Sequence, residues 1–133
     1  MPGQYIARGR EQHNYAVTEE INIDNGSGTT SDWILLVPDK NIYIEHARVF
    51  YTEATDTAGV ASATVKIGTA IAGATVVAAT ALQVSKAIGA TTSLVIAAPY
   101  VAAGSILVVR HTGIATTEAG KYKVQIRYRI LNS

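Results

Sequence analysis

The sequence contains no cysteine, and this absence excludes one kind of stabilisation and one kind of chemistry. Without thiols the chain forms neither disulfides nor thiolate metal centres, so its stability must come from packing or assembly. Charged residues are also scarce, at 16% of the 133 positions, where soluble domains carry about a quarter. Part of the surface is therefore expected to be covered by another molecule.

A recognisable export signal and a convincing membrane span are lacking as well. The start, MPGQYIARGREQHN, has no apolar core of the secretory type, so no export sequence is expected and the chain is predicted to be intracellular when made. Residues 87–109 carry no charge, but Gly89, Pro99 and Gly104 interrupt them, so buried sheet explains this stretch better than a transmembrane helix. We expect no membrane contact.

Hydrophobic residues are plentiful, at 48%, and at this length they suffice for one core. We expect two parts, an extended N-terminal arm over residues 1–14 and a single domain over residues 15–133. The arm is polar and has neither helical nor strand periodicity.

Two readings of the arm remain open, a disordered end or a clamp on a neighbouring subunit. If it clamps, Tyr5 and Ile6 are its anchors and Arg8 and Arg10 are candidate contacts beside them.

The clearest strand is the last one. Its apolar residues alternate with polar ones at a period of two, which leaves little room for a helix. One face carries Tyr122, Val124, Ile126, Tyr128 and Ile130, and the other carries Lys121, Lys123, Gln125, Arg127 and Arg129. The second face forms a basic stripe that is too short to predict nucleic-acid binding.

Earlier segments alternate less regularly. Over residues 15–23 we expect a strand with Tyr15, Val17, Ile21 and Ile23 on one face, interrupted at Glu19. Over residues 41–52 the apolar positions change phase, which predicts either a bulge near Glu45 and His46 or a strand that passes from one sheet to the other.

Further short strands are expected over residues 33–37, 61–67, 92–97 and 105–111, the last two buried on both faces. Residues 68–86 are rich in Ala, Thr and Val, and for them we expect a strand end followed by one or two helical turns. The whole pattern predicts an all-β, antiparallel β-sandwich that is jelly-roll-like, with an extended N-terminal arm.

No catalytic constellation is visible. The G-x-S-x-G motif of hydrolases is missing, and His13, His46 and His111 have no second ligand at the spacing of helical zinc sites. Glu19 and Glu20 are adjacent, so in a strand they point to opposite faces. We expect no enzyme activity, no metal and no cofactor; a small hydrolase built on a sandwich is the least favoured function.

Trp33 is the only tryptophan and is a candidate interface residue. Aromatic rings of this size fill a core or, when exposed, stack on sugars, and its neighbour Ile34 favours the core.

The order of pieces in residues 60–130 resembles the capsid decoration, or cement, proteins of tailed bacteriophages. A strand ending in VKIGTA is followed by VVAATAL, then by TTSLVIA, VAAGSILVVRHTG and the terminal KYKVQIRYRI. The resemblance implies a β-sandwich, often a homotrimer, that binds the outer capsid surface at junctions between major capsid proteins. It implies a virion protein made in the host cytoplasm, with the major capsid protein as partner and without nucleic acid. The alternative is a phage fibre, tail or adhesin-like module that binds a host glycan.

Overall fold

The computed structural model describes residues 14–23, 30–55, 63–82, 86–113 and 120–131, and all regular structure in these ranges is β-strand. The strands are β1 (Asn14–Val17), β2 (Ile21–Asn22), β3 (Thr30–Leu36), β4 (Ile42–Glu53), β5 (Thr64–Gly68), β6 (Val77–Ala81), β7 (Thr91–Ser93), β8 (Tyr100–Val101), β9 (Leu107–Thr112) and β10 (Lys121–Ile130). The expected all-β class is confirmed.

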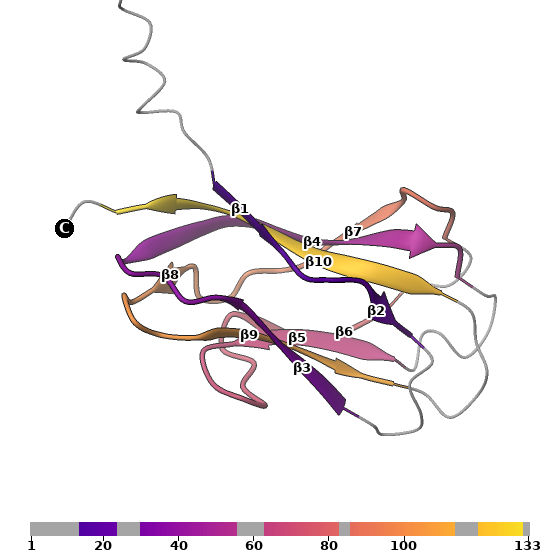
Figure 1. Ribbon diagram of the computed structural model, residues 1–133, viewed down its shortest axis with the longest axis horizontal. Helices are drawn as coiled ribbons and strands as arrows, with labels where there is room; N and C mark the ends of the chain where they lie inside the picture. The colour runs from indigo at the N-terminus through magenta and orange to yellow at the C-terminus, as the bar shows by residue number, and fades with distance from the viewer. Residues whose placement is uncertain (1–13, 24–29, 56–62, 83–85, 114–119, 132–133) are drawn as a thin grey trace, which may run out of the picture.

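The strands form two antiparallel sheets that lie one above the other (Figure 1). Sheet A has the order β1-β10-β4-β7, with β2 also beside β10 and β8 also beside β4. Sheet B has the order β3-β9-β5-β6. This arrangement is the predicted β-sandwich.

The connections between the sheets give the fold its jelly-roll topology. If β1 with β2 and β7 with β8 are each counted as one strand position, the chain passes through eight positions. The first pairs with the eighth, β3 with β9, β4 with β7 and β8, and β5 with β6, all antiparallel. Such nested pairing is what a long hairpin produces when it is rolled into two sheets.

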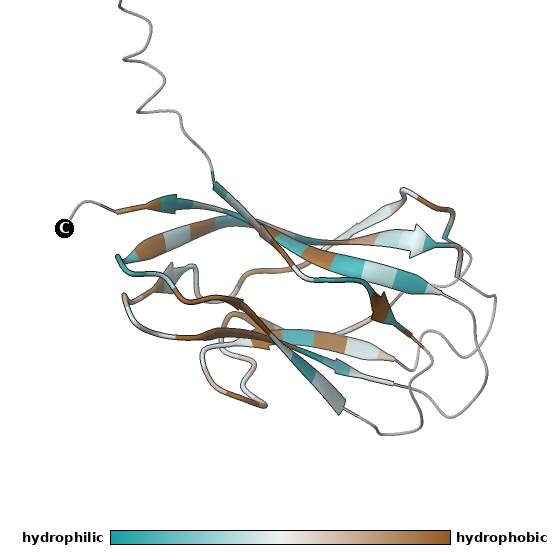
Figure 2. Cartoon of the chain, viewed as in Figure 1, coloured by the Kyte–Doolittle hydropathy of each residue, from teal (hydrophilic) through white to brown (hydrophobic). Residues whose placement is uncertain are grey.

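The core lies between the sheets and is supplied by alternate residues of the longer strands. In β10, Tyr122, Val124 and Ile126 are fully buried, and in β5 Val65 and Ile67 are too. Figure 2 shows hydrophobic and hydrophilic residues alternating along both strands. The two faces predicted for the last strand are therefore confirmed over residues 121–128, whereas Ile130 at its end is 45% exposed.

The predicted bulge in β4 is also confirmed. Arg127 pairs with His46 and the next residue of β10 pairs with Ile44, so Glu45 is the extra residue of β4. The extra residue lets Ile44 and Ala47 both point into the core, although they lie three positions apart.

The face predicted for residues 15–23 is wrong in its first half. Tyr15 and Val17 point outward, with 59% and 49% of their surface exposed, while Ile21 is buried. The cause is Thr18, whose N–H donates to the Val124 carbonyl at 2.9 Å and whose Oγ1 accepts from the Val124 N–H at 3.0 Å. The side chain of Thr18 replaces a backbone partner, and the alternation changes phase between β1 and β2.

The helical turns expected within residues 68–86 are not found where the structure describes that segment, because residues 77–81 form β6. Small Ala and Thr side chains are compatible with both a helix and a strand, and backbone hydrogen bonds to a neighbouring strand select the strand. The Val76 N–H donates to the Ile67 carbonyl and the Leu82 N–H to the Ala63 carbonyl, which extends the ladder beside β5 at both ends.

Residues 92–97 are likewise not a strand buried on both faces. Only residues 91–93 form β7, and Val95 is 82% exposed. The Leu94 N–H still bonds to Ala47 in sheet A, whereas the Ala97 N–H bonds to Val76 beside sheet B. The segment thus crosses from one sheet to the other. By contrast, β9 is buried on both faces at residues 107–109, as predicted.

The predicted arm falls outside the described residues up to residue 13. Asn14, assigned to the arm from the sequence, is the first residue of β1.

Candidate functional site

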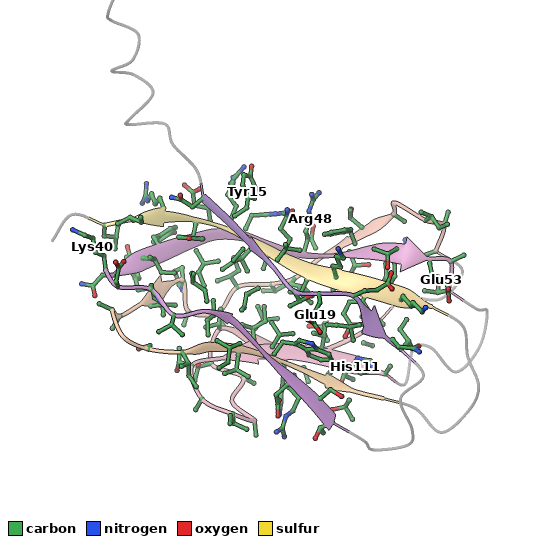
Figure 3. All side chains as sticks on the ribbon, in the orientation of Figure 1. Tyr15, Glu19, Lys40, Arg48, Glu53 and His111 are labelled. Carbon is green, nitrogen blue, oxygen red and sulfur yellow. The ribbon has the colours of Figure 1, made fainter. Side chains whose placement is uncertain are left out.

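A buried polar pair joins the two sheets in the interior of the sandwich. His111 of β9 and Tyr122 of β10 are both fully buried, and the His111 Nδ1 lies 2.6 Å from the Tyr122 hydroxyl. The His111 Nε2 lies 3.2 Å from the Ile23 carbonyl oxygen. Figure 3 shows His111 between the two sheets.

These contacts determine the tautomer of His111. A carbonyl oxygen only accepts, so Nε2 carries the proton and donates to Ile23, and Nδ1 accepts from the Tyr122 hydroxyl. Burial lowers the pKa of His111 and outweighs the opposing effect of the Ile23 carbonyl. Burial is the main cause that raises the pKa of Tyr122, and electrostatic repulsion from the neighbouring Tyr51 adds to it. Both side chains are therefore neutral at pH 7, and the pair is a satisfied structural contact.

No reactive constellation is found in the described ranges. The hydrogen-bond partners of His111 are the buried Tyr122 hydroxyl and a backbone carbonyl, and no carboxylate is among them. His46 is exposed next to the β4 bulge, and His13 lies outside the described residues. Within those residues no group of three or more His, Cys, Asp or Glu side chains could hold a metal ion. Nor does any helix there have the length and apolarity to cross a membrane.

The outer face of sheet A is different in character, because aromatic and cationic side chains gather on it. We call it the Tyr–Arg face. It carries Tyr15, Tyr43, Arg48, Phe50, Tyr100, Lys121, Lys123, Arg127 and Arg129. Figure 3 shows Tyr15 and Arg48 directed away from the sandwich on this side. The face is built from strands far apart in sequence: β10 and β4 supply the cations, and β1, β4 and β8 supply the rings.

Two arginines of this face lie over aromatic rings. The guanidinium carbon of Arg129 is 4.7 Å from the centre of the Tyr43 ring, and that of Arg48 is 5.8 Å from the centre of the Phe50 ring. Tyr43 also meets Tyr100 edge to face, with ring centres 4.8 Å apart. These contacts hold the long arginine side chains in defined positions without neutralising them.

The charge of the face is only partly compensated. Lys121 Nζ lies 3.9 Å from Glu53, and Arg127 Nε lies 3.3 Å from Glu45 without hydrogen-bond geometry. The charged residues of β4 and β10 sum to +3. None of the ion pairs found in the described ranges involves Arg48, Lys123 or Arg129.

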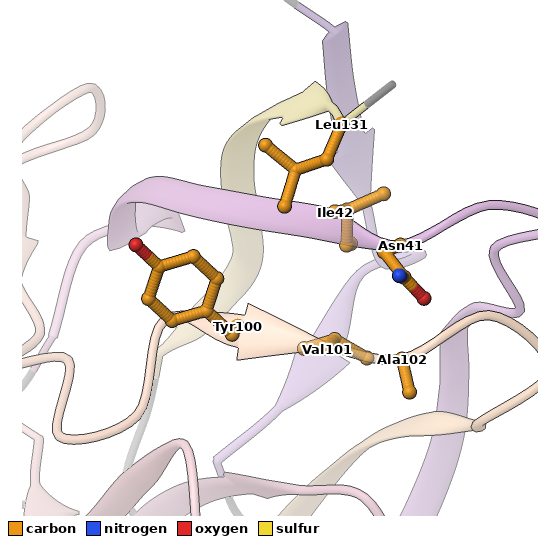
Figure 4. A pocket seen from close by; sticks show the side chains of 6 residues that line it. All are labelled: Asn41, Ile42, Tyr100, Val101, Ala102 and Leu131. Atoms are coloured by element: carbon orange, nitrogen blue, oxygen red, sulfur yellow. The ribbon is translucent and has the colours of Figure 1, made fainter. Parts of the chain in front are cut away.

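A shallow groove borders the Tyr–Arg face at the Tyr100 end (Figure 4). It is lined by Asn41, Ile42, Tyr100, Val101, Ala102 and Leu131. The groove is open and mostly apolar, and its volume of about 270 Å³ is below the size of ordinary small-molecule pockets. It suits a single side chain of a protein partner better than a metabolite.

On the outer face of sheet B, by comparison, the central charged side chains are paired with each other. Asp32 and Arg110 form a two-pronged ion pair at 2.8 and 2.9 Å in the middle of this face. The Arg110 guanidinium lowers the pKa of Asp32, and the carboxylate raises that of Arg110. The face also carries Lys66 and Ile34, which is 65% exposed, and β6 adds small alanine and threonine side chains. Its central arginine is already paired with a carboxylate, which distinguishes this face from the Tyr–Arg face.

Of the site residues predicted from the sequence, Tyr5, Ile6, Arg8 and Arg10 lie outside the described part of the chain. Trp33 is half-buried in β3 and packs against the core, and its Nε1–H donates to Glu19 at 3.4 Å. The placement agrees with the core reading of Trp33.

The sequence identified the cations of β10 as a stripe but not the rings beside them. Tyr43, Phe50 and Tyr100 reach that stripe through the pairing of β4 with β10 and of β4 with β8. Only the alternation of Tyr43 between two buried isoleucines indicated that a tyrosine faces outward there.

No family model and no curated protein sequence matches the chain. Among solved structures, a chain of the cyanophage Pam1 capsid asymmetric unit is similar, with a TM-score of 0.61 and 14% sequence identity. The similarity covers 90% of this chain and 86% of that chain. At this identity the similarity shows a shared fold.

Proposed function

We propose that this chain is a structural protein of a bacteriophage virion, which binds the outer surface of the capsid and stabilises contacts between major capsid proteins. The observation that carries the proposal is the fold shared, over nearly the whole of both chains, with a component of the cyanophage Pam1 capsid asymmetric unit. The order of pieces in residues 60–130 points in the same direction independently.

The surface chemistry supports a binding role over a catalytic one, and we propose that the chain is not an enzyme. The buried polar pair is satisfied by its own contacts. The Tyr–Arg face presents the residue types that dominate protein interfaces, and Tyr43 contacts both Tyr100 and Arg129. A trimer on the shell is the assembly that the resemblance favours.

Binding to capsids tests this function directly. Purified protein is mixed with capsids of the phage whose genome encodes it, after removal of any resident copies, and the capsids are sedimented and heated. We expect the protein to co-sediment at a fixed number of copies per shell and to raise the temperature at which the shells release DNA. Absence of co-sedimentation, together with unchanged heat resistance, would refute the proposal.

Glycan binding through Trp33 is the competing function. The ring already packs against the core and its N–H is bonded to Glu19, so a reduced aromatic surface is left for a sugar. A glycan-array signal that disappears in the Trp33→Ala variant, with folding retained, would favour this alternative over capsid binding.

A further inference from the structure

We propose that the Tyr–Arg face of sheet A is the docking surface of this protein and that its partner is a protein surface rich in carboxylates. The inference rests on the proposed function in one respect, since the capsid supplies the partner used to test it. The chemistry of the face is derived from the described residues alone.

The first argument is the state of the arginines. A guanidinium has five N–H donors in its plane, and a ring beneath it occupies only its flat side. Arg129 lies over Tyr43 in this way. Arg48 lies near Phe50 and uses its Nε–H on Gln125 at 2.8 Å, which leaves the two terminal nitrogens. Each is therefore positioned to donate a pair of hydrogen bonds to a carboxylate.

The second argument is how charge is distributed along the face. The carboxylate of Glu53 and that of Glu20, which accepts from the Thr52 hydroxyl at 2.6 Å, lie at the carboxyl end of β4. Tyr43 lies at the opposite end of this strand, where Arg129 is its neighbour on β10. Glu45 also lies toward this end and faces Arg127, so Arg129 is the cation beside the aromatic pair that has no carboxylate among the described residues. Arg48 lies near the middle of β4, and Lys123 is opposite Phe50. Positive potential of this kind attracts acidic protein surfaces and sets their orientation.

The third argument is the groove next to that end. Tyr100 belongs both to the aromatic pair and to the groove wall, and it is 68% exposed. Exposed tyrosine beside arginine and an apolar recess is the composition of an interface centre, where one partner side chain is buried and carboxylates surround it. The outer face of sheet B has no such combination, because its central arginine is already paired with Asp32.

The test compares two double variants of the full chain that remove the same charge. R48Q/R129Q removes two cations from the Tyr–Arg face, and K40Q/K66Q removes two from the β3–β4 turn and sheet B. Circular dichroism and thermal unfolding first establish that both variants are folded. We expect R48Q/R129Q to weaken capsid binding by roughly tenfold or more, while K40Q/K66Q binds as the unaltered protein does.

A third variant separates geometry from charge. R48K/R129K keeps both charges but loses the planar fork, so we expect an intermediate loss of affinity. Carbodiimide cross-linking, which joins a lysine amine to a carboxylate in contact with it, then identifies the partner groups. We expect Lys123 to be joined to aspartates or glutamates of the capsid protein, and Lys66 not to be.

The outcomes distinguish this inference from the proposed function. If the unaltered protein binds capsids and R48Q/R129Q binds equally well, the face is wrong and the function stands. If the unaltered protein does not bind capsids, the function fails, and retention on poly-L-glutamate beads tests the face alone. Equal retention of the two charge-matched variants would then overturn the inference. Retention on duplex DNA but not on poly-L-glutamate would overturn it as well.

Discussion

Tyr122→Phe removes one oxygen atom from the centre of the sandwich, and its cost follows from the geometry around that atom. The Tyr122 hydroxyl is the donor to His111 Nδ1 at 2.6 Å, and both side chains are fully buried. The ring of Phe refills the space of the tyrosine ring. His111 Nδ1 is left without its donor in a site where water has no access.

An unsatisfied buried acceptor costs about 1–3 kcal/mol, so we expect Tyr122→Phe to lower the free energy of unfolding by about 2 kcal/mol. Urea unfolding followed by tryptophan fluorescence measures the change. Tyr15→Phe is the matched control, since Tyr15 is 59% exposed and its hydroxyl faces solvent, and we expect a change below about 0.5 kcal/mol.

The double variant His111→Leu/Tyr122→Phe completes the comparison. It removes the orphaned acceptor together with its donor, so its cost should be lower than the sum of the two single costs, by about 1–2 kcal/mol. Equal effects of Tyr122→Phe and Tyr15→Phe would refute the cross-sheet hydrogen bond.

Three further predictions concern the same fold. Because burial holds the pKa of His111 below that of an unfolded histidine, the unfolded state takes up the proton first as the pH falls. The free energy of unfolding should therefore decrease below about pH 6.5, and it should decrease less in His111→Gln. An equal decrease in the two proteins would contradict the lowered pKa of His111. Ile126→Asp should cost several kcal/mol and Lys123→Ser less than about 0.5 kcal/mol, and similar urea midpoints would show that the faces of β10 are misassigned. At Gly68 a Cβ atom would lie 2.4 Å from the carbonyl carbon of Gly73, so Gly68→Ala should destabilise by about 1–3 kcal/mol, and an unaltered midpoint would contradict the close approach of these backbones.

The sequence alone was sufficient where one period dominates. The alternation along β10 specified its two faces up to Tyr128, and the phase change in β4 predicted either a bulge near Glu45 and His46 or a strand crossing between sheets. The structure shows the bulge, at Glu45. Both signals are local, because each depends only on which neighbours are apolar.

The sequence was insufficient where the local structure depends on a residue or strand that is distant along the chain. Residues 77–81 have side chains small enough for a helix or a strand, and β5 selects the strand through backbone hydrogen bonds. Thr18 shifts the alternation through its bonds to Val124, 106 positions away in the sequence. The Tyr–Arg face is assembled from four strands, so the basic stripe was visible in the sequence and its aromatic partners were not.

Electron cryomicroscopy of capsids saturated with the purified protein tests the central claim most directly. We predict added density with the shape of this β-sandwich on the outer surface of the shell, at junctions between capsid subunits, with sheet A and its Arg129–Tyr43–Tyr100 cluster against the shell. Shells without added density at saturating protein would contradict a capsid role, and density with sheet B against the shell would contradict the docking surface.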